Sequence, residues 1–378
     1  MLMKSLKNLR ASDHLNFIRS FAAVMVLFAH LRSCFFVPYE HIASPTFVVK
    51  CLFILSGWGS EAVIIFFVLS GFLVGASGYS QIRNNTYSWQ TYLISRFTRL
   101  YVVLIPSLAL SFLVVYFGDG VFLGASKHPD IGLNALVNNM LFLQTRTSTF
   151  AGNLPLWSLS NEFWYYVLFP CLMLFLTTKS MAKKVGYFSL QMLIFLLIGK
   201  EKSLYFIIWL MGVGVYLLKP YSLLAHKPRL RTIISTLPLI GLAVVFILSH
   251  FYHAHLRLSY DFANAGFFSI FLYLILQNKT LSSNDWYHKF ATETSGCSYT
   301  LYLVHYPLLL LFMKVLHVEC SWPFDVQHIF FSGLIFLIIL GFSYCFSQIT
   351  EAHTDKVRKY ITQRVAFFSA LGQTRFMP

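Results

Sequence analysis

The chain has 378 residues, of which 57% are hydrophobic, 18% aromatic and only 11% charged. In soluble domains about a quarter of the residues are charged. This composition therefore excludes an ordinary soluble protein and indicates a polytopic membrane protein. The formal net charge of +15 does not indicate nucleic-acid binding, because Lys and Arg lie in short clusters between apolar segments. The six cysteines show no metal-ligand spacing, so no metal is expected; Cys51 and Cys320, on one predicted side, could form a disulfide.

In chain order, ten apolar runs are long enough to span a bilayer as helices. The two shortest, Val185–Gly199 and Leu204–Leu218, also fit a single kinked hairpin. Gly118–Leu154 contains NALVNNMLFL, which is too short to span and predicts an interfacial or re-entrant helix. The sequence therefore predicts an all-α bundle, with a transmembrane core over residues 15–350 and a cytoplasmic tail over 351–378. The predicted spans begin at Leu15, Ser60, Tyr92, Pro155, Val185, Leu204, Thr232, Asp261, Gly296 and His328.

Basic residues are distributed unevenly between the two sets of loops. With the N-terminus inside, the inner loops carry about three times as many Lys and Arg residues as the outer loops, which is the positive-inside pattern. We therefore expect both termini in the cytoplasm. The inner set is Lys4, Lys7, Arg10, Arg83, Arg96, Arg99, Lys179, Lys183, Lys184, Lys219, Lys227, Arg229, Arg231, Lys279, Lys289, Lys356, Arg358, Lys359, Arg364 and Arg375; the outer set is Arg32, Lys50, Lys127, Arg146, Lys200, Lys202 and Arg257.

The first span, NFIRSFAAVMVLFAH, carries Arg19 near its beginning and His30 at its end. Eleven positions make just over three helical turns, so both side chains point to nearly the same face, about 16 Å apart along the axis. Charged residues inside a span normally face a polar cavity, so this pair predicts a cavity along the helix. The alternative is an arginine that snorkels to the interface and a histidine bonded to a backbone carbonyl.

Two further spans carry charged residues at helical spacing. Arg96 and Arg99, in RFTR, share one face, and arginine binds phosphate with two parallel hydrogen bonds; ordinary positive-inside flanking is the alternative. In PLWSLSNEFWYYVLFP, Ser158, Glu162 and Tyr166 recur every four residues on one face. A carboxylate within a span is a candidate functional group. Its alternative role is an ion pair with an arginine of another span.

The ninth span, GCSYTLYLVHYPLL, places His305 in an aromatic, apolar setting two residues before Pro307. Proline kinks a helix and frees a backbone carbonyl. A catalytic role for His305 and a core histidine bonded to the backbone both fit this pattern.

Together these stretches resemble the acyltransferase 3 family of integral membrane acyltransferases, from Asn16 to about Thr350. The resemblance is specific because five elements occur in the expected order on ten spans. These elements are the Arg-x10-His of Arg19 and His30, FFVLSGFL from Phe66 to Leu73, the Arg-x-x-Arg of Arg96 and Arg99, LWSLSNEFWYY, and SYTLYLVHYP.

The resemblance implies a bacterial cytoplasmic membrane protein that takes an acyl group, usually acetyl, from cytoplasmic acyl-CoA. The acceptor it implies is a hydroxyl of a cell-surface or lipid-linked carbohydrate. His30 matches the essential histidine of the family and Arg19 its partner. The remaining matches are Arg96 and Arg99 for holding the donor, Glu162 for the motif glutamate, and Ser70, Tyr166 and His305 as further candidates at the donor site.

Many relatives also carry a fused hydrolase-like domain of the SGNH type, which we expect this chain to lack. Either the chain completes the transfer alone or a separate extracytoplasmic transferase finishes it. A neutral His30 would take the proton of the attacking hydroxyl or accept the acyl group itself. The alternative function is a transporter of lipid-linked saccharides or organic anions, since intramembrane charges suit transport equally well; a catalytically inactive scaffold is a third alternative.

Overall fold

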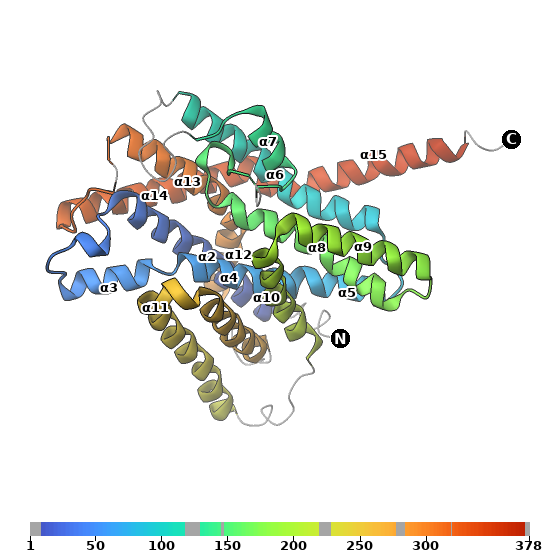
Figure 1. The fold of residues 1–378 in the computed structure, drawn as a ribbon, viewed down its shortest axis with the longest axis horizontal. Coiled ribbons are helices and arrows are strands. Elements are labelled where there is room, and N and C mark those ends of the chain that lie inside the picture. The colour runs from blue at the N-terminus through green and yellow to red at the C-terminus, as the bar shows by residue number, and fades with distance from the viewer. Residues whose placement is uncertain are drawn as a thin grey trace.

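The structure is a computed structural model that describes residues 9–117, 129–144, 147–218, 228–276, 284–318 and 320–374. Helices dominate these residues, and no strand occurs among them beyond one isolated bridge between Phe36 and Trp322. The predicted all-α membrane bundle is thereby confirmed (Figure 1). Of the basic residues assigned to loops above, those outside the described ranges are Lys4, Lys7, Lys127, Arg146, Lys219, Lys227, Lys279 and Arg375.

The chain order of the elements follows the predicted spans closely. The α-helices are α2 (Leu9–Phe35), α3 (Phe47–Ser56), α4 (Gly59–Ser70), α5 (Ala76–Arg83), α6 (Trp89–Tyr116), α7 (Leu133–Met140), α8 (Leu156–Thr177), α9 (Met181–Ile198), α10 (Lys200–Leu217), α11 (Pro228–Leu276), α12 (Asp285–Gly296), α13 (Ser298–Val315), α14 (Val326–Ile349) and α15 (Thr354–Thr374). Short 3-10 turns are η1 (Tyr39–His41), η3 (Phe150–Gly152) and η5 (Glu351–His353), and η2 (Gly71–Gly75) is a π-helical turn.

Each of the ten predicted spans coincides with a helical segment. Among the described residues, eight segments are long and apolar enough to cross a membrane. Two of the predicted spans do not meet this requirement of length and apolar composition. One is α10, and the other is the first half of α11, whose apolar stretch is limited to Thr236–Ser249. The run NALVNNMLFL forms the short helix α7, as expected from its length.

Helix α11 contains two of the predicted spans, because its 49 residues double back on themselves. Figure 1 shows it as two arms that meet at an angle. The arms pack together: a Cβ placed on Gly241 would lie 2.4 Å from the ring of Phe267. Two helical arms therefore lie where the sequence predicted two spans, and the second of them, Arg257–Leu276, is long and apolar enough to cross a membrane.

The motif FFVLSGFL lies where α4 and α10 approach most closely. A Cβ added to Gly71 would lie 1.8 Å from the backbone oxygen of Trp209, and one added to Gly212 would lie 2.0 Å from that of Val68. Small residues permit such backbone contact between membrane helices. The indole N–H of Trp209 also donates to Ser70 Oγ over 3.1 Å. The glycines thus fix the position of Ser70.

Helices α2 and α13 run side by side in the same direction. Arg19 of α2 contacts Ser298 at the beginning of α13, and His30 contacts His305 further along both helices. The interface between these two helices therefore contains two polar contacts. One lies near the beginning of both helices, and the other lies further along both.

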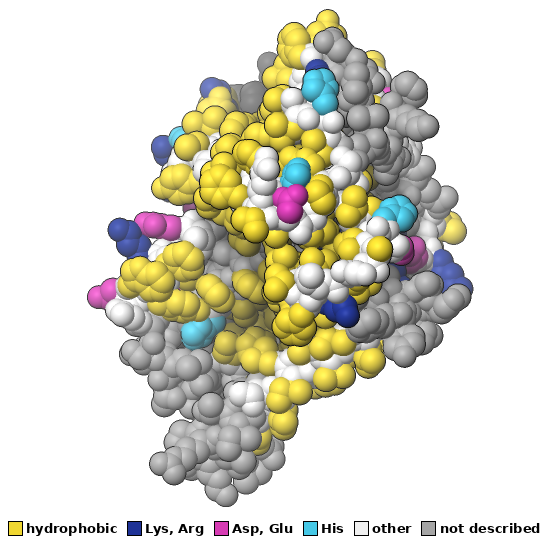
Figure 2. Space-filling view, turned by 90° about the vertical axis from the view of Figure 1, so that its left-hand side faces the viewer, with side chains coloured by type: hydrophobic (Ala, Val, Ile, Leu, Met, Phe, Trp, Pro, Cys, Tyr) yellow, Lys and Arg dark blue, Asp and Glu magenta, His cyan; other side chains and the backbone are white. Residues whose placement is uncertain are grey.

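Charge differs between the two ends of the bundle. At the left of Figure 1 lie α3 and the beginning of α14, and Figure 2 shows that hydrophobic side chains predominate there while basic side chains are sparse. Helix α15, which carries Lys356, Arg358, Lys359 and Arg364, extends from the opposite end of the molecule (Figure 1). The cytoplasmic location of both termini stays a prediction from the distribution of Lys and Arg.

Candidate active site

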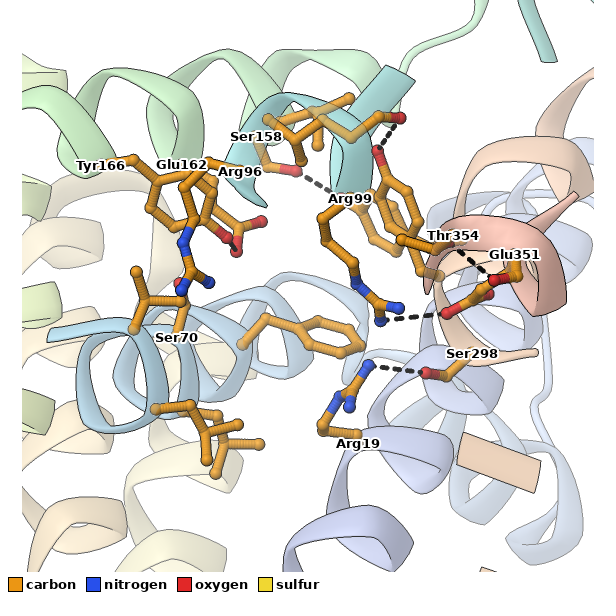
Figure 3. A pocket seen from close by; sticks show the side chains of 18 of the residues that line it. Arg19, Ser70, Arg96, Arg99, Ser158, Glu162, Tyr166, Ser298, Glu351 and Thr354 are labelled. Carbon is orange, nitrogen blue, oxygen red and sulfur yellow. Dashed lines mark hydrogen bonds and ion pairs between the residues drawn. The ribbon is translucent and has the colours of Figure 1, made fainter. Parts of the chain in front are cut away.

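A cavity of about 500 Å3 opens among six helices, α2, α4, α6, α8, α13 and α15, and the turns η2 and η5. Figure 3 shows its polar side chains converging from different elements. The apolar part of its wall comes mainly from α4. Its charged and hydroxyl-bearing lining residues are Arg19, Ser70, Ser95, Arg96, Arg99, Ser158, Glu162, Tyr166, Ser298, Tyr299, Tyr302, Glu351, Thr354, Asp355 and Arg358.

Glu351, at the end of the last span, anchors one side of the cavity. Its Oε1 forms an ion pair of 3.0 Å with Nη2 of Arg99. Its Oε2 accepts hydrogen bonds from the backbone N–H and the hydroxyl of Thr300, both over 3.0 Å. Thr300 lies in the first turn of α13, where exposed N–H groups and the helix dipole favour a carboxylate. Helix α13 therefore holds Glu351, and Glu351 holds the Arg99 guanidinium in place.

Two other arginines of the cavity have no such partner. Arg19 donates from Nη2 to Ser298 Oγ over 3.4 Å. The Arg96 guanidinium lies 5.4 Å from the ring centre of Tyr92 and 5.9 Å from that of Tyr166. Among the described residues neither arginine forms an ion pair. Their charges are thus free of direct carboxylate contact, which suits the binding of an anion.

The face of α8 predicted from its four-residue spacing does line the cavity. The Tyr166 hydroxyl donates to Glu162 Oε1, one turn away on the same helix. Ser158 Oγ lies 2.6 Å from the hydroxyl of Tyr302 on α13. Glu162 therefore stays hydrogen-bonded within its own helix, and the Ser158–Tyr302 contact joins α8 to α13 at the cavity wall.

Beyond Tyr302 lies a pair of histidines. His30 Nδ1 is 2.9 Å from His305 Nε2, and the two rings stack with their centres 5.2 Å apart. His305 is fully buried, whereas His30 is only partly buried. The ring of Tyr302 lies 6.1 Å from that of His305. Tyr302 therefore lines the cavity and also neighbours the histidine pair.

The hydrogen bonds of this pair determine which nitrogens carry protons. His305 Nδ1 lies 2.9 Å from the backbone oxygen of Leu301. A carbonyl oxygen only accepts, so in neutral His305 Nδ1 carries the proton and Nε2 is an acceptor. His30 Nδ1 must then donate to His305 Nε2. Neutral His30 is left with an unprotonated Nε2, which is the form of imidazole that acts as a base or nucleophile.

The structure brings most of the residues singled out in the sequence to one cavity. Arg19, Arg96, Arg99, Ser70, Glu162 and Tyr166 line it together. His30 and His305 are not among the described residues that line it, and His30 is bonded to His305 rather than to Glu162.

Sequence reasoning missed Glu351 and Tyr302. Glu351 was detectable as an isolated carboxylate at the inner end of an apolar span. Tyr302 precedes His305 by three positions within SYTLYLVHYP, which is one helical turn. Both residues could thus be noticed in the sequence, but the sequence does not show which residue of another helix each of them contacts.

These features define a multi-pass membrane protein with an arginine-lined cavity next to a buried histidine pair. The chain belongs to the acyltransferase 3 family, because the model of that family, described as an acyltransferase domain, matches residues 13–365.

Two curated proteins are similar to parts of the chain. An uncharacterized protein of Haemophilus influenzae is 28% identical over 144 residues, which cover 36% of this chain and 58% of that protein. Acyltransferase MdmB of Streptomyces mycarofaciens is 29% identical over 161 residues, which cover 40% of this chain and 37% of MdmB. The chain therefore matches about half of the length of these relatives. No solved structure matches it.

Proposed function

We propose that this protein transfers an acyl group, specifically acetyl, from cytoplasmic acetyl-CoA to a hydroxyl of a cell-surface or lipid-linked carbohydrate, in a bacterial cytoplasmic membrane. The observation that carries the proposal is an arginine-lined cavity whose lining residue Tyr302 neighbours the ring of His305, the hydrogen-bond partner of His30. The carbohydrate acceptor rests on the family resemblance. A separate extracytoplasmic transferase would be needed only if the acceptor does not reach His30.

The cavity suits a phosphorylated donor with a long arm. Arg19 and Arg96 offer guanidinium groups without carboxylate partners, and Arg99 is held by Glu351. Guanidinium groups bind phosphate oxygens strongly and remain charged at any physiological pH. Arg19 and His30 are separated by about 16 Å along α2. The extended pantetheine arm of coenzyme A covers a comparable length, so phosphates at the arginines would place the thioester near the histidines.

The histidine pair suits the transfer step. The Nε2 lone pair of His30 takes the proton from the acceptor hydroxyl while its oxygen attacks the thioester carbon. The coenzyme A sulfur leaves as a thiolate and takes up the proton that His30 Nε2 accepted from the hydroxyl, which regenerates neutral His30. During this step the His30 imidazolium keeps donating from Nδ1 to His305 Nε2, which stabilises the positive charge. A route through an acyl-imidazole would use the same Nε2 lone pair.

The test is donor turnover by the purified full-length protein in detergent or nanodiscs. Acetyl-CoA and a surface glycan acceptor are supplied, released thiol is titrated, and the acetylated glycan is measured by mass spectrometry. We expect thiol release and acetyl transfer in equal amounts. A transporter would release no thiol, and such a result with correctly folded protein would refute the proposal.

We expect Arg96→Ala to weaken donor binding more than it slows the bound-state reaction. A hydrogen bond to a charged group contributes about 1.5–3 kcal/mol, so the dissociation constant of coenzyme A should rise roughly 10- to 100-fold. Calorimetric titration of the purified protein measures this change. Arg83→Ala is the matched control, because Arg83 is exposed at the end of α5 and does not line the cavity. Unchanged affinity in Arg96→Ala would contradict the phosphate-binding role.

A further inference from the structure

The outer end of α2 pairs with the loop between α13 and α14. The backbone N–H of Cys320 donates to the oxygen of Cys34 over 3.0 Å, and that of Trp322 donates to Phe35 over 2.9 Å. Val37 N–H completes the pairing by donating to the oxygen of Trp322 over 3.1 Å. This short parallel ladder fixes the register in which Cys34 and Cys320 face each other.

The two cysteines are close enough to be bridged. A backbone hydrogen bond between the two residues holds their Cα atoms about 6 Å apart, which lies within the range that disulfides use. The Cys320 thiol donates to the oxygen of Ser33, the neighbour of Cys34, over 3.0 Å. The Cys320 sulfur therefore lies beside the backbone of the residue that precedes Cys34.

Cys320 also adopts a backbone conformation that is unusual for its residue type. Its φ is +43°, in the left-handed region that residues with a Cβ avoid. Such a conformation persists only where the surrounding structure imposes it. The ladder to α2 supplies that constraint, so the position of the Cys320 side chain is set by the contact with Cys34.

We propose that Cys34 and Cys320 form a disulfide on the outer, oxidising side of the membrane. The expected orientation places the end of α2 on that side, and disulfides persist in such compartments. The sequence pointed to Cys51 as the partner of Cys320, whereas the structure points to Cys34. The proposal is independent of the acyl-transfer chemistry.

The bond forms by thiol–disulfide exchange with an extracytoplasmic protein disulfide or low-molecular-weight disulfide. The Cys320 thiolate, which is more accessible than the buried Cys34, attacks the disulfide of the co-reactant and releases one thiol. The Cys34 thiolate then displaces the second thiol and closes the bridge. The two protein thiols lose two protons and two electrons, and these reduce the co-reactant disulfide to two thiols.

The bridge would tie together the two helices that carry the histidine pair. Cys34 follows His30 by one helical turn on α2, and Cys320 lies in the loop that leaves α13 beyond His305. Closing a loop that contains most of the chain constrains the unfolded state strongly. We therefore expect a reductant to lower the midpoint of thermal unfolding by about 5 °C or more.

The test is a thiol-trapping experiment on the full-length protein in its native membrane. Cells are lysed in N-ethylmaleimide, the protein is denatured without reductant, and peptides are mapped by mass spectrometry. We expect a linked pair of peptides that contain Cys34 and Cys320. Cys34→Ser should make Cys320 reactive toward the maleimide, and Cys320→Ser should do the same for Cys34. Cys51→Ser is the matched control and should leave the link intact.

Alkylation of both Cys34 and Cys320 in the wild-type protein would overturn the proposal. A link between Cys51 and Cys320, or a link that appears only after an oxidant is added, would overturn it as well. None of these outcomes depends on acetyl-CoA turnover, so the disulfide and the proposed function can fail separately.

Discussion

The His30→Ala protein should lose acyl transfer by roughly 10²- to 10⁴-fold, the range expected for removal of a general base. His30 is the partly accessible member of the histidine pair, and its Nε2 is the atom left unprotonated by the hydrogen bonds of the pair. His305 does not replace it, because the ring of His305 is fully buried on the neighbouring helix α13. Acetylated glycan per enzyme molecule, measured under single-turnover conditions, gives the rate.

His328→Ala is the matched control for this experiment. His328 lies at the beginning of α14, where it contacts Asp325, and it does not line the cavity. Its replacement should leave the transfer rate within about twofold, as for surface substitutions away from a site. Affinity for coenzyme A should be retained in His30→Ala, because the arginines that hold the phosphates are intact. Full transfer by a stably inserted His30→Ala protein would rule out the assignment of the catalytic base.

The second large effect is expected at His305, which acts through His30. In His305→Leu the apolar side chain fills the buried site, but His30 Nδ1 loses its acceptor. The tautomer and orientation of His30 are then unfixed, and its imidazolium is no longer stabilised. Loss of a residue with this role slows catalysis severely, and we expect a fall in kcat on the order of 10²-fold. The dissociation constant of coenzyme A should not change.

A conservative variant separates this positioning role from a merely structural one. The amide oxygen of His305→Gln can accept the hydrogen bond from His30 Nδ1, so part of the lost kcat should return. A structural defect would lower the thermal midpoint and the protein yield in both variants, without selective rescue by glutamine. A wild-type kcat in His305→Leu would contradict the proposal that the His305 ring positions His30.

The sequence alone determined the membrane bundle and the local faces of its helices. Each span is recognisable because a bilayer requires about 20 apolar residues whose backbone groups are bonded within the helix. The shared face of Arg96 and Arg99, and that of Ser158, Glu162 and Tyr166, follows from the helical repeat. All five of these side chains line the same cavity in the structure. The repeat therefore predicted correctly which residues of one helix act together.

The same repeat gives no information about which helices are neighbours. His30 and His305 are 275 positions apart, and their contact exists because α2 and α13 pack side by side in the same direction. The Arg99–Glu351 ion pair and the Cys34–Cys320 ladder likewise join elements from opposite ends of the chain. A helix fixes the direction of a side chain around its own axis, whereas packing against other helices fixes what that side chain meets. The sequence thus predicted which residues of α6 and α8 line the cavity together, and only the tertiary structure decided which partner orients His30.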